Sequence, residues 1–410
     1  MPESTPLLAR QPIFNAQMQV VAYELLCRNS AIFAAKVFDG DAASSQVLLN
    51  AFTEMPIEQL VGKHRAYINF TRTLLDSPPP FSNQQMVIEV LEGQNIDDSM
   101  LQSLKRLREQ GYTIALDDFE LNEQTQVLVP YADIIKLDVI YLSASKLQQH
   151  INLLKPLGIT LLAEKVETYE MFETCKALGF DLFQGYFLAR PKIISGRKIA
   201  ENKQAVLQLL STLHNPNSPI DKIERMIASD PLLSFKLLRL VNSAAFGLSR
   251  NVDSLRQAIM LLGLNKLKNW VDLLALSNLG GKPHELSVTA LTRARMCELI
   301  AAKMNSSIRP DSYFTVGLFS TLDAFLDAPL EDLLSKISLT EPLNQAMLKH
   351  LGPEGIILKI VKSHEQGQWD SIDWNYLETQ GISESMISAI YLEALVWVEE
   401  TINNLSASTK

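Results

Sequence analysis

The sequence predicts an α/β domain, a TIM-like (β/α) barrel, followed by an all-α domain. Residues 1 to about 195 contain short β-rich runs separated by amphipathic stretches of helical length, whereas the pattern after Pro191 is helical with few β-rich runs. A chain of 410 residues corresponds to two or three domains at roughly 150 residues each. We therefore predict two domains, at residues 1–197 and 198–410.

The β-rich runs of the first domain recur at a regular interval. Six of them start 20 to 27 residues apart, at Tyr67, Val87, Thr113, Asp133, Thr160 and Asp181. An earlier run, QVVAYELL, adds a seventh strand. Strands that alternate with helices imply right-handed βαβ units and a parallel sheet. At least seven strands favour a closed barrel over an open sheet.

Two of the intervening stretches carry clear helix signals. Met100, Leu104 and Leu107 recur every three or four residues, which is the spacing of one helix face. The other stretch opens with Ser143, a helix-capping residue, and closes at Gly158.

Composition restricts the class of protein. The 37 Lys and Arg residues against 46 Asp and Glu give a net charge of −9, which argues against binding a nucleic-acid polymer. The three cysteines, Cys27, Cys175 and Cys297, lack metal-ligand spacing and indicate a reducing compartment. The N-terminus does not resemble a signal peptide, and no apolar run approaches the 18 residues of a membrane span. We expect a cytoplasmic protein.

Polar residues cluster where the apolar runs end. In a parallel barrel the carboxyl ends of all strands meet at one mouth, where active sites lie. Carboxylates gathered there repel one another unless divalent cations held by oxygen ligands neutralise them. The residues are Glu24, Asn69, Glu89, Glu92, Asp117, Asp118, Lys136, Asp138, Glu164, Glu167 and Gln184.

A simpler interpretation exists for each position alone. One acidic residue after a strand commonly caps the next helix, and a lysine commonly forms a surface salt bridge of little energetic value. Recurrence after nearly every strand argues against this interpretation for the set. A lysine inside the parallel-strand run DIIKLDVIYL is better explained by pairing with the acidic cluster or by activating a water.

These segments resemble, in order, those of the EAL domain, the bacterial phosphodiesterase of cyclic di-GMP. QPIFNAQMQVVAYELLCR resembles the opening segment, with Glu24-Leu25-Leu26 in place of Glu-Ala-Leu. YINF, IEVLEG, IALDDF, IIKLD, AEKVET and LGFDLFQGYFLARP resemble later segments of the family. The resemblance covers about the first 195 residues.

The resemblance implies hydrolysis of cyclic di-GMP to pGpG with two Mg²⁺ or Mn²⁺ ions. Lys136 matches a residue that orients or activates the attacking water, and Glu167 and Gln184 match residues that position that water and the metal ligands. Gln11 and Arg28 match substrate contacts, and the planar guanidinium of Arg28 suits a phosphate. The matched metal-binding positions are Glu24, Asn69, Glu89, Asp117, Asp118 and Glu164.

Three departures from the family pattern leave the activity open. Glu120 replaces the glycine of DDFG and the loop after it is unrecognisable, Lys165 replaces the glycine of AEGVE, and Leu25 replaces a small alanine. The changed loop also removes the family's usual argument for a homodimer, which stays possible. The retained ligand set favours hydrolysis. The alternative is a degenerate domain that serves as a nucleotide sensor or protein scaffold.

The helical half resembles the HDOD domain, a relative of HD phosphohydrolases. Asp230-Pro231, Asn242-Ser243, Ser254 and Leu262-Gly263 fall in that family's order. Ser320 and Thr321 stand where HD enzymes carry a His-Asp pair, and two hydroxyls cannot replace that metal anchor. We therefore expect a non-catalytic domain that regulates the barrel or recruits a protein partner. Two alternatives are a helical bundle that only packs or dimerises and an HDOD domain that carries the output.

Overall fold

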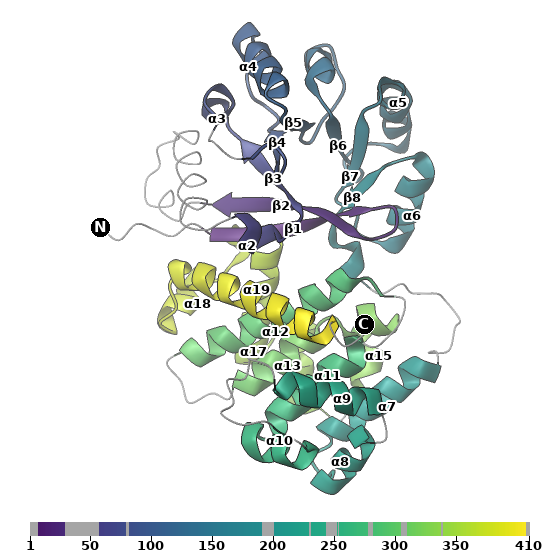
Figure 1. The fold of residues 1–410 in the computed structure, drawn as a ribbon, viewed down its shortest axis with the longest axis vertical. Coiled ribbons are helices and arrows are strands. Elements are labelled where there is room, and N and C mark those ends of the chain that lie inside the picture. The colour runs from purple at the N-terminus through teal and green to yellow at the C-terminus, as the bar shows by residue number, and fades with distance from the viewer. Residues whose placement is uncertain are drawn as a thin grey trace. The chain divides into compact units, whose positions relative to one another are not determined.

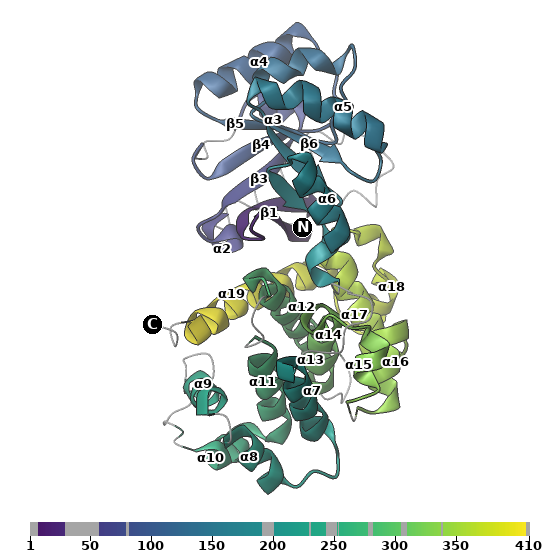
Figure 2. The same ribbon diagram turned by 90° about the vertical axis from the view of Figure 1, so that its right-hand side faces the viewer.

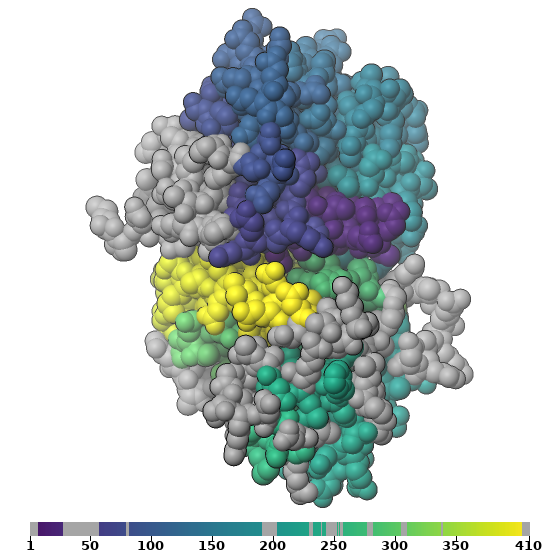
Figure 3. All heavy atoms as spheres, in the orientation of Figure 1, coloured from purple at the N-terminus to yellow at the C-terminus, as the bar shows by residue number. Residues whose placement is uncertain are grey.

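The computed structural model describes most of the chain, drawn in colour in Figure 3. The described residues are 7–28, 57–78, 82–190, 201–228, 231–242, 252, 254–277, 282–304, 310–337 and 339–406. The chain divides into two compact units, one of Met1–Leu188 with Glu365–Gly367 and one of Ala189–His364 with Gln368–Lys410. The predicted boundary at residues 197–198 lies outside the described residues.

Eight strands close a barrel in sequence order, which confirms the predicted fold (Figure 1). From β2 to β8 each strand is parallel to the next, whereas β1 is antiparallel to both β2 and β8. The strands are β1 Leu7–Asn15, β2 Val20–Arg28, β3 Arg65–Phe70, β4 Met86–Val90, β5 Thr113–Leu116, β6 Ile134–Asp138, β7 Thr160–Glu164 and β8 Leu182–Gln184.

Strand β1, which the sequence pattern did not reveal, runs against the others because a short turn joins it to β2. The Asn15 side chain accepts hydrogen bonds from the backbone N–H groups of Gln17 and Gln19, and Met18 adopts a left-handed φ of 59°. A connection this short can join only antiparallel strands, since parallel strands need a crossover of a dozen or more residues.

Helices surround the strands of the barrel unit (Figure 2). Three of them begin with a side-chain cap: Asp97, Ser143 and Thr168 each accept a hydrogen bond from a backbone N–H three residues on. Between β5 and β6 stands the 3₁₀ helix η2, Thr125–Tyr131. The α-helices are α2 Ile57–Val61, α3 Arg72–Asp76, α4 Asp98–Glu109, α5 Ala144–Leu154 and α6 Tyr169–Leu178.

The barrel interior has an apolar layer directly below the predicted site residues. Its buried members are Ile13, Ala22, Tyr67, Val87, Ala115, Ile134 and Leu162, with Leu182 packed against them. Side chains alternate between the two faces of a strand, so residues two positions apart share a face. Along β2 to β8, the residue two positions after each member of this apolar layer is polar. These polar residues are Glu24, Asn69, Glu89, Asp117, Lys136, Glu164 and Gln184. On the reversed strand β1, Gln11 precedes Ile13 by two.

The second unit is helical, as predicted. Ser254 caps α10 by accepting from the backbone N–H of Gln257, whereas Asp230 and Ser243 of the HDOD-like segment lie outside the described residues. No helix in the described part of the chain is long and apolar enough to cross a membrane. The helices are α7 Glu201–His214, α8 Ile220–Ala228, α9 Pro231–Val241, α10 Leu255–Leu262, α11 Leu264–Ser277, α12 His284–Lys303, α13 Pro310–Phe319, α14 Leu322–Leu326, α15 Leu330–Leu334, α16 Glu341–Lys349, α17 Gly352–Glu365, α18 Trp374–Thr379 and α19 Glu384–Ser406.

Candidate functional site

Four carboxylates converge on one buried ammonium at the mouth of the barrel. Lys136 of β6 is fully buried. Its Nζ lies 2.6 Å from Glu89 Oε1, 2.7 Å from Asp117 Oδ1, 2.9 Å from Glu164 Oε1 and 3.2 Å from Glu24 Oε2. These four acids come from β2, β4, β7 and the residue after β5. The structure therefore brings together four of the six predicted metal ligands around the predicted catalytic lysine.

Two amides extend this cluster. Gln184 of β8 donates from Nε2 to Glu24 Oε2 at 2.6 Å and to Gln11 Oε1 at 3.1 Å. Asn69 of β3 donates from Nδ2 to Glu24 Oε1 at 3.4 Å. Because Glu24 accepts from Lys136, Gln184 and Asn69 at once, it is the best-satisfied acid of the group.

The four acids differ in the pKa of their carboxyl groups because burial and neighbouring charges act on each of them differently. Burial raises the pKa of Glu24, but attraction to Lys136 and the three donated hydrogen bonds outweigh it and lower that pKa. Burial, followed by repulsion from Glu24, raises the pKa of Glu89 well above its usual value. Burial raises the pKa of Glu164 to about 7, against the attraction of Lys136. The acids hold the pKa of Lys136 well above its usual value although burial lowers it, so this residue is a fixed cation.

The oxygens left unsatisfied in this cluster fit a hard cation. Asn69 Oδ1, Glu89 Oε2, Glu164 Oε2 and Gln184 Oε1 are buried without a hydrogen-bond partner. Among the described residues, no group of three or more His, Cys, Asp or Glu side chains is arranged to hold a metal ion as it stands. One ammonium still leaves an excess of negative charge beside orphaned oxygen donors. Mg²⁺ and Mn²⁺ prefer such oxygen ligands, so the residues present fit the predicted ions.

A second, smaller cluster forms around Lys165. Its Nζ lies 2.5 Å from Asp138 Oδ2 and 3.3 Å from Asp118 Oδ1. Glu164, which directly precedes Lys165 in the chain, pairs with Lys136. Asp118, a predicted metal ligand, is therefore separate from the ion pairs of Lys136. Asp138 is one of the polar residues predicted at the barrel mouth from its place at the end of β6, and the family resemblance assigned it no role.

Two of the predicted site residues, Glu167 and Arg28, are not part of the contacts described above. Glu167 is half-buried in the loop between β7 and α6, outside the four ion pairs of Lys136. Arg28 ends β2, and its side chain lies outside the described part of the structure.

The unusual loop after Asp118 is built by its own hydrogen bonds. Asn122 Oδ1 accepts from the backbone N–H groups of Gln124 and Thr125, and Thr125 Oγ1 donates to the Glu120 carbonyl at 2.6 Å. Glu120 Oε1 pairs with Lys146 Nζ at 2.6 Å. Glu120 is not among the described residues with a positive φ. A side chain at this family glycine position therefore does not force a strained backbone.

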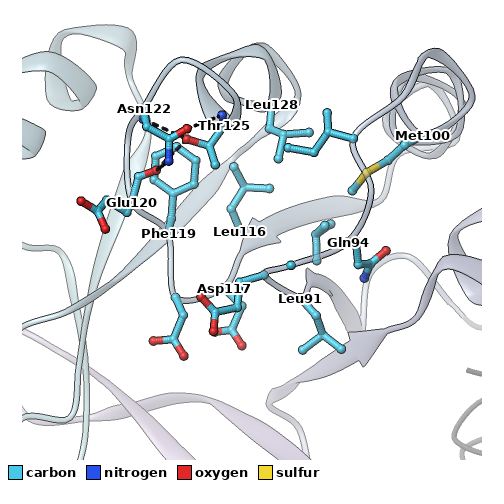
Figure 4. A pocket seen from close by; sticks show the side chains of 15 residues that line it. Leu91, Gln94, Met100, Leu116, Asp117, Phe119, Glu120, Asn122, Thr125 and Leu128 are labelled. Atoms are coloured by element: carbon cyan, nitrogen blue, oxygen red, sulfur yellow. Dashed lines mark hydrogen bonds between the residues drawn. The ribbon is translucent and has the colours of Figure 1, made fainter. Parts of the chain in front are cut away.

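This loop forms one wall of a pocket of about 230 Å³ next to the acidic cluster (Figure 4). Asp117 lies at one end, and Asn122, Thr125 and Leu128 lie at the other. The remaining lining comes from the ends of β4 and β5, from the segment after β4 and from the start of α4. The pocket extends the site toward the altered loop.

In the helical unit, the two hydroxyls predicted to replace a His-Asp pair have structural partners. Ser320 Oγ accepts from Arg293 Nη1 at 2.8 Å and donates to the Gly317 carbonyl at 2.6 Å. Thr321 Oγ1 donates to the Leu318 carbonyl at 2.8 Å. Arg293 is buried, so a guanidinium lies beside this position.

The same unit contains an ion pair between a buried aspartate and a histidine that no sequence pattern indicates. His214 Nε2 of α7 lies 2.7 Å from Asp272 Oδ2 of α11. Burial raises the pKa of Asp272 although His214 lowers it. The two residues are 58 positions apart in the chain, so only the helix packing brings them together.

The fold and the site define a class: a two-domain protein with an acidic, lysine-centred barrel mouth and a separate helical domain. Family comparison matches the EAL domain to residues 36–191 and the HDOD domain to residues 199–337. An uncharacterized protein of Bacillus subtilis, YuxH, is 36% identical over 405 residues, covering 95% of this chain and 97% of its own length. The cyclic di-GMP phosphodiesterase CdgJ of Vibrio cholerae is 31% identical, covering 98% of this chain and 94% of its own.

The chain belongs to the family of proteins in which an EAL domain is followed by an HDOD domain. Among solved structures, BlrP1 of Klebsiella pneumoniae, in complex with manganese and cyclic di-GMP, matches 45% of this chain and 56% of its own at 26% identity, with a TM-score of 0.37.

Proposed function

We propose that the protein hydrolyses cyclic di-GMP to pGpG with Mg²⁺ or Mn²⁺ bound at the barrel mouth. The observation that carries this proposal is the convergence of Glu24, Glu89, Asp117 and Glu164 on Lys136, with orphaned oxygens beside them. The relation to CdgJ, whose name records this activity, supports it. The family resemblance also matches Asn69 and Asp118 to metal-binding positions.

The divalent ions would supply an activated water and neutralise charge on the scissile phosphodiester. The chain's own residues have distinct roles in this proposal. The oxygen ligands of the metal would come from five residues at the barrel mouth: Glu24, Asn69, Glu89, Asp117 and Glu164. Lys136 keeps its proton because of the surrounding acids, so it donates hydrogen bonds to the water and its neighbours and does not abstract a proton.

Three other residues position the ligands and the substrate in this proposal. Gln184 holds Glu24 in place through a 2.6 Å hydrogen bond and links it to Gln11. Gln11 and Arg28 contact the dinucleotide. Glu167 orients groups next to Glu164.

The direct test is incubation of the purified protein with cyclic di-GMP and Mn²⁺ or Mg²⁺, with pGpG followed by chromatography. We expect pGpG to form, and Glu24→Ala to abolish it, because Glu24 organises the hydrogen bonds of Lys136, Gln184 and Asn69. Glu173→Gln, on an exposed face of α6, is the matched control and should leave turnover unchanged. Binding of cyclic di-GMP without any product at high protein concentration would favour the sensor role instead.

Metal binding is expected to release protons near neutral pH. A ligand carboxylate must lose its proton to coordinate a cation, and Glu164, whose pKa is raised to about 7, is partly protonated there. The affinity for Mn²⁺ should therefore weaken as pH falls below 7. Calorimetric titration with Mn²⁺ at pH 6.5, in two buffers of different ionisation enthalpy, should give different heats, and Glu164→Gln should reduce that difference. Equal heats for the unmodified protein would contradict this linkage.

We further propose that the helical unit is a non-catalytic domain that regulates the barrel or recruits a protein partner. The structural hydrogen bonds of Ser320 and Thr321 support this assignment. A homodimer and the cytoplasmic location stay predictions.

A further inference from the structure

Lys165 stands at a position where a side chain is unfavourable. It follows directly after β7 and has a φ of 56°, in the left-handed region that favours glycine. Its side chain, 51% exposed, nevertheless reaches back to two acids at the barrel mouth. A lysine in this backbone conformation indicates that its ammonium has a local role there.

The two acids that Lys165 contacts are arranged to hold it. Asp138 Oδ1 accepts hydrogen bonds from the backbone N–H groups of Ile140 and Tyr141, which leaves Oδ2 to face Lys165 Nζ at 2.5 Å. The Asp138 side chain is only 12% exposed, so this contact is more shielded than a surface salt bridge. Lys165 Nζ also lies 3.3 Å from Asp118 Oδ1. One ammonium thus bridges the ends of β5 and β6.

The two clusters differ in what they offer a divalent cation. The Lys136 cluster sets four carboxylates against one ammonium and contains orphaned oxygens of Glu89 and Glu164. The Lys165 cluster sets only two carboxylates against one ammonium, and both of them contact Lys165 Nζ. A divalent ion on Asp118 would also be repelled by the ammonium beside it.

We propose that the Lys165 ammonium takes the place of one of the two divalent cations, so that the barrel mouth binds a single divalent ion in the Lys136 cluster. This inference rests on the proposed function and specifies its metal requirement. Asp118 then serves as an anchor for Lys165 and not as a metal ligand. Lys165 is a positioning residue that fixes positive charge next to Asp118 at the edge of the site.

The experiment counts bound metal and does not depend on turnover. The full-length protein is stripped with chelator and equilibrated with Mn²⁺, and bound manganese per chain is measured by elemental analysis. Low-temperature EPR then distinguishes an isolated Mn²⁺ from a spin-coupled pair. Lys165→Gly and Lys165→Gln remove the ammonium, and glycine also suits the left-handed backbone. Lys146→Gln, which removes an ammonium from the exposed Glu120 pair, is the matched control.

We expect one Mn²⁺ per chain in the unmodified protein and in Lys146→Gln, with the spectrum of an isolated ion. Lys165→Gly and Lys165→Gln should bind two, with a spin-coupled spectrum. Two ions in the unmodified protein, or one ion in both Lys165 variants, would overturn the inference while leaving metal-dependent hydrolysis intact. No bound ion in any of these proteins would contradict the proposed function as well, and the hydrolysis assay separates the two failures.

Discussion

Glu89→Gln is expected to abolish hydrolysis and at the same time to stabilise the metal-free protein. Glu89 is fully buried, its Oε1 contacts Lys136 at 2.6 Å, and its Oε2 has no hydrogen-bond partner. Its pKa is raised well above the usual value by burial and by the repulsion of Glu24. The carboxyl therefore opposes folding at neutral pH, because the unfolded chain holds it as a solvated anion. A neutral amide of the same shape removes that penalty.

The expected loss of activity is about 100-fold or more, since even residues that only support metal ligands typically cost 10- to 100-fold when removed. The expected gain in stability of the chelator-treated protein is about 1 kcal/mol, the usual size of such a stabilising substitution. Thermal unfolding with EDTA measures the gain, and pGpG formation measures the loss. Glu173→Gln should change neither quantity. If Glu89→Gln were less stable than the unmodified protein, the Glu89 carboxylate would stabilise the metal-free fold through its contact with Lys136, which would contradict the prediction.

The sequence was sufficient to predict the site layer because that layer follows the strand period. Each parallel strand places an apolar side chain in the barrel and then, two residues on, a polar one at its carboxyl end. Ala22 precedes Glu24 and Ile134 precedes Lys136 in this way. The alternation of side chains along each strand was therefore enough to predict which polar residues lie together at the barrel mouth.

Strand β1 and the Lys165 cluster could not be predicted in this way. Pro12 lies inside β1 and weakens its strand pattern, since proline cannot donate to a ladder. In the structure Pro12 pairs with Tyr23 of β2 and lies outside the part of β1 that pairs with β8, which is Ile13 to Asn15. The contact of Lys165 with Asp118 and Asp138 depends on how three separate strand ends are placed around the mouth. No spacing along the chain encodes that distance. The family pattern also has glycine, which has no side chain, at the position of Lys165.

Lys136→Met is expected to give the largest loss of stability in the barrel. The substitution leaves Glu24, Glu89, Asp117 and Glu164 near one another with no ammonium between them. Removing one partner from a buried ion pair costs about 3–5 kcal/mol. Urea unfolding of the chelator-treated protein at pH 8 measures the loss. Lys155→Met, which breaks the exposed pair with Asp181, should cost less than about 1 kcal/mol.

The loss in Lys136→Met should depend on pH and on metal in a defined direction. Burial and neighbouring acids raise the pKa values of Glu89, Asp117 and Glu164, so lowering the pH below 7 protonates these acids and removes their repulsion. The difference from the unmodified protein should therefore shrink between pH 8 and pH 6. Mn²⁺ should also restore stability, because a cation that binds only the folded state shifts the equilibrium toward it. If the difference were constant with pH and unaffected by Mn²⁺, Lys136 would act through packing alone, and the barrel mouth would not be a charge-driven cation site.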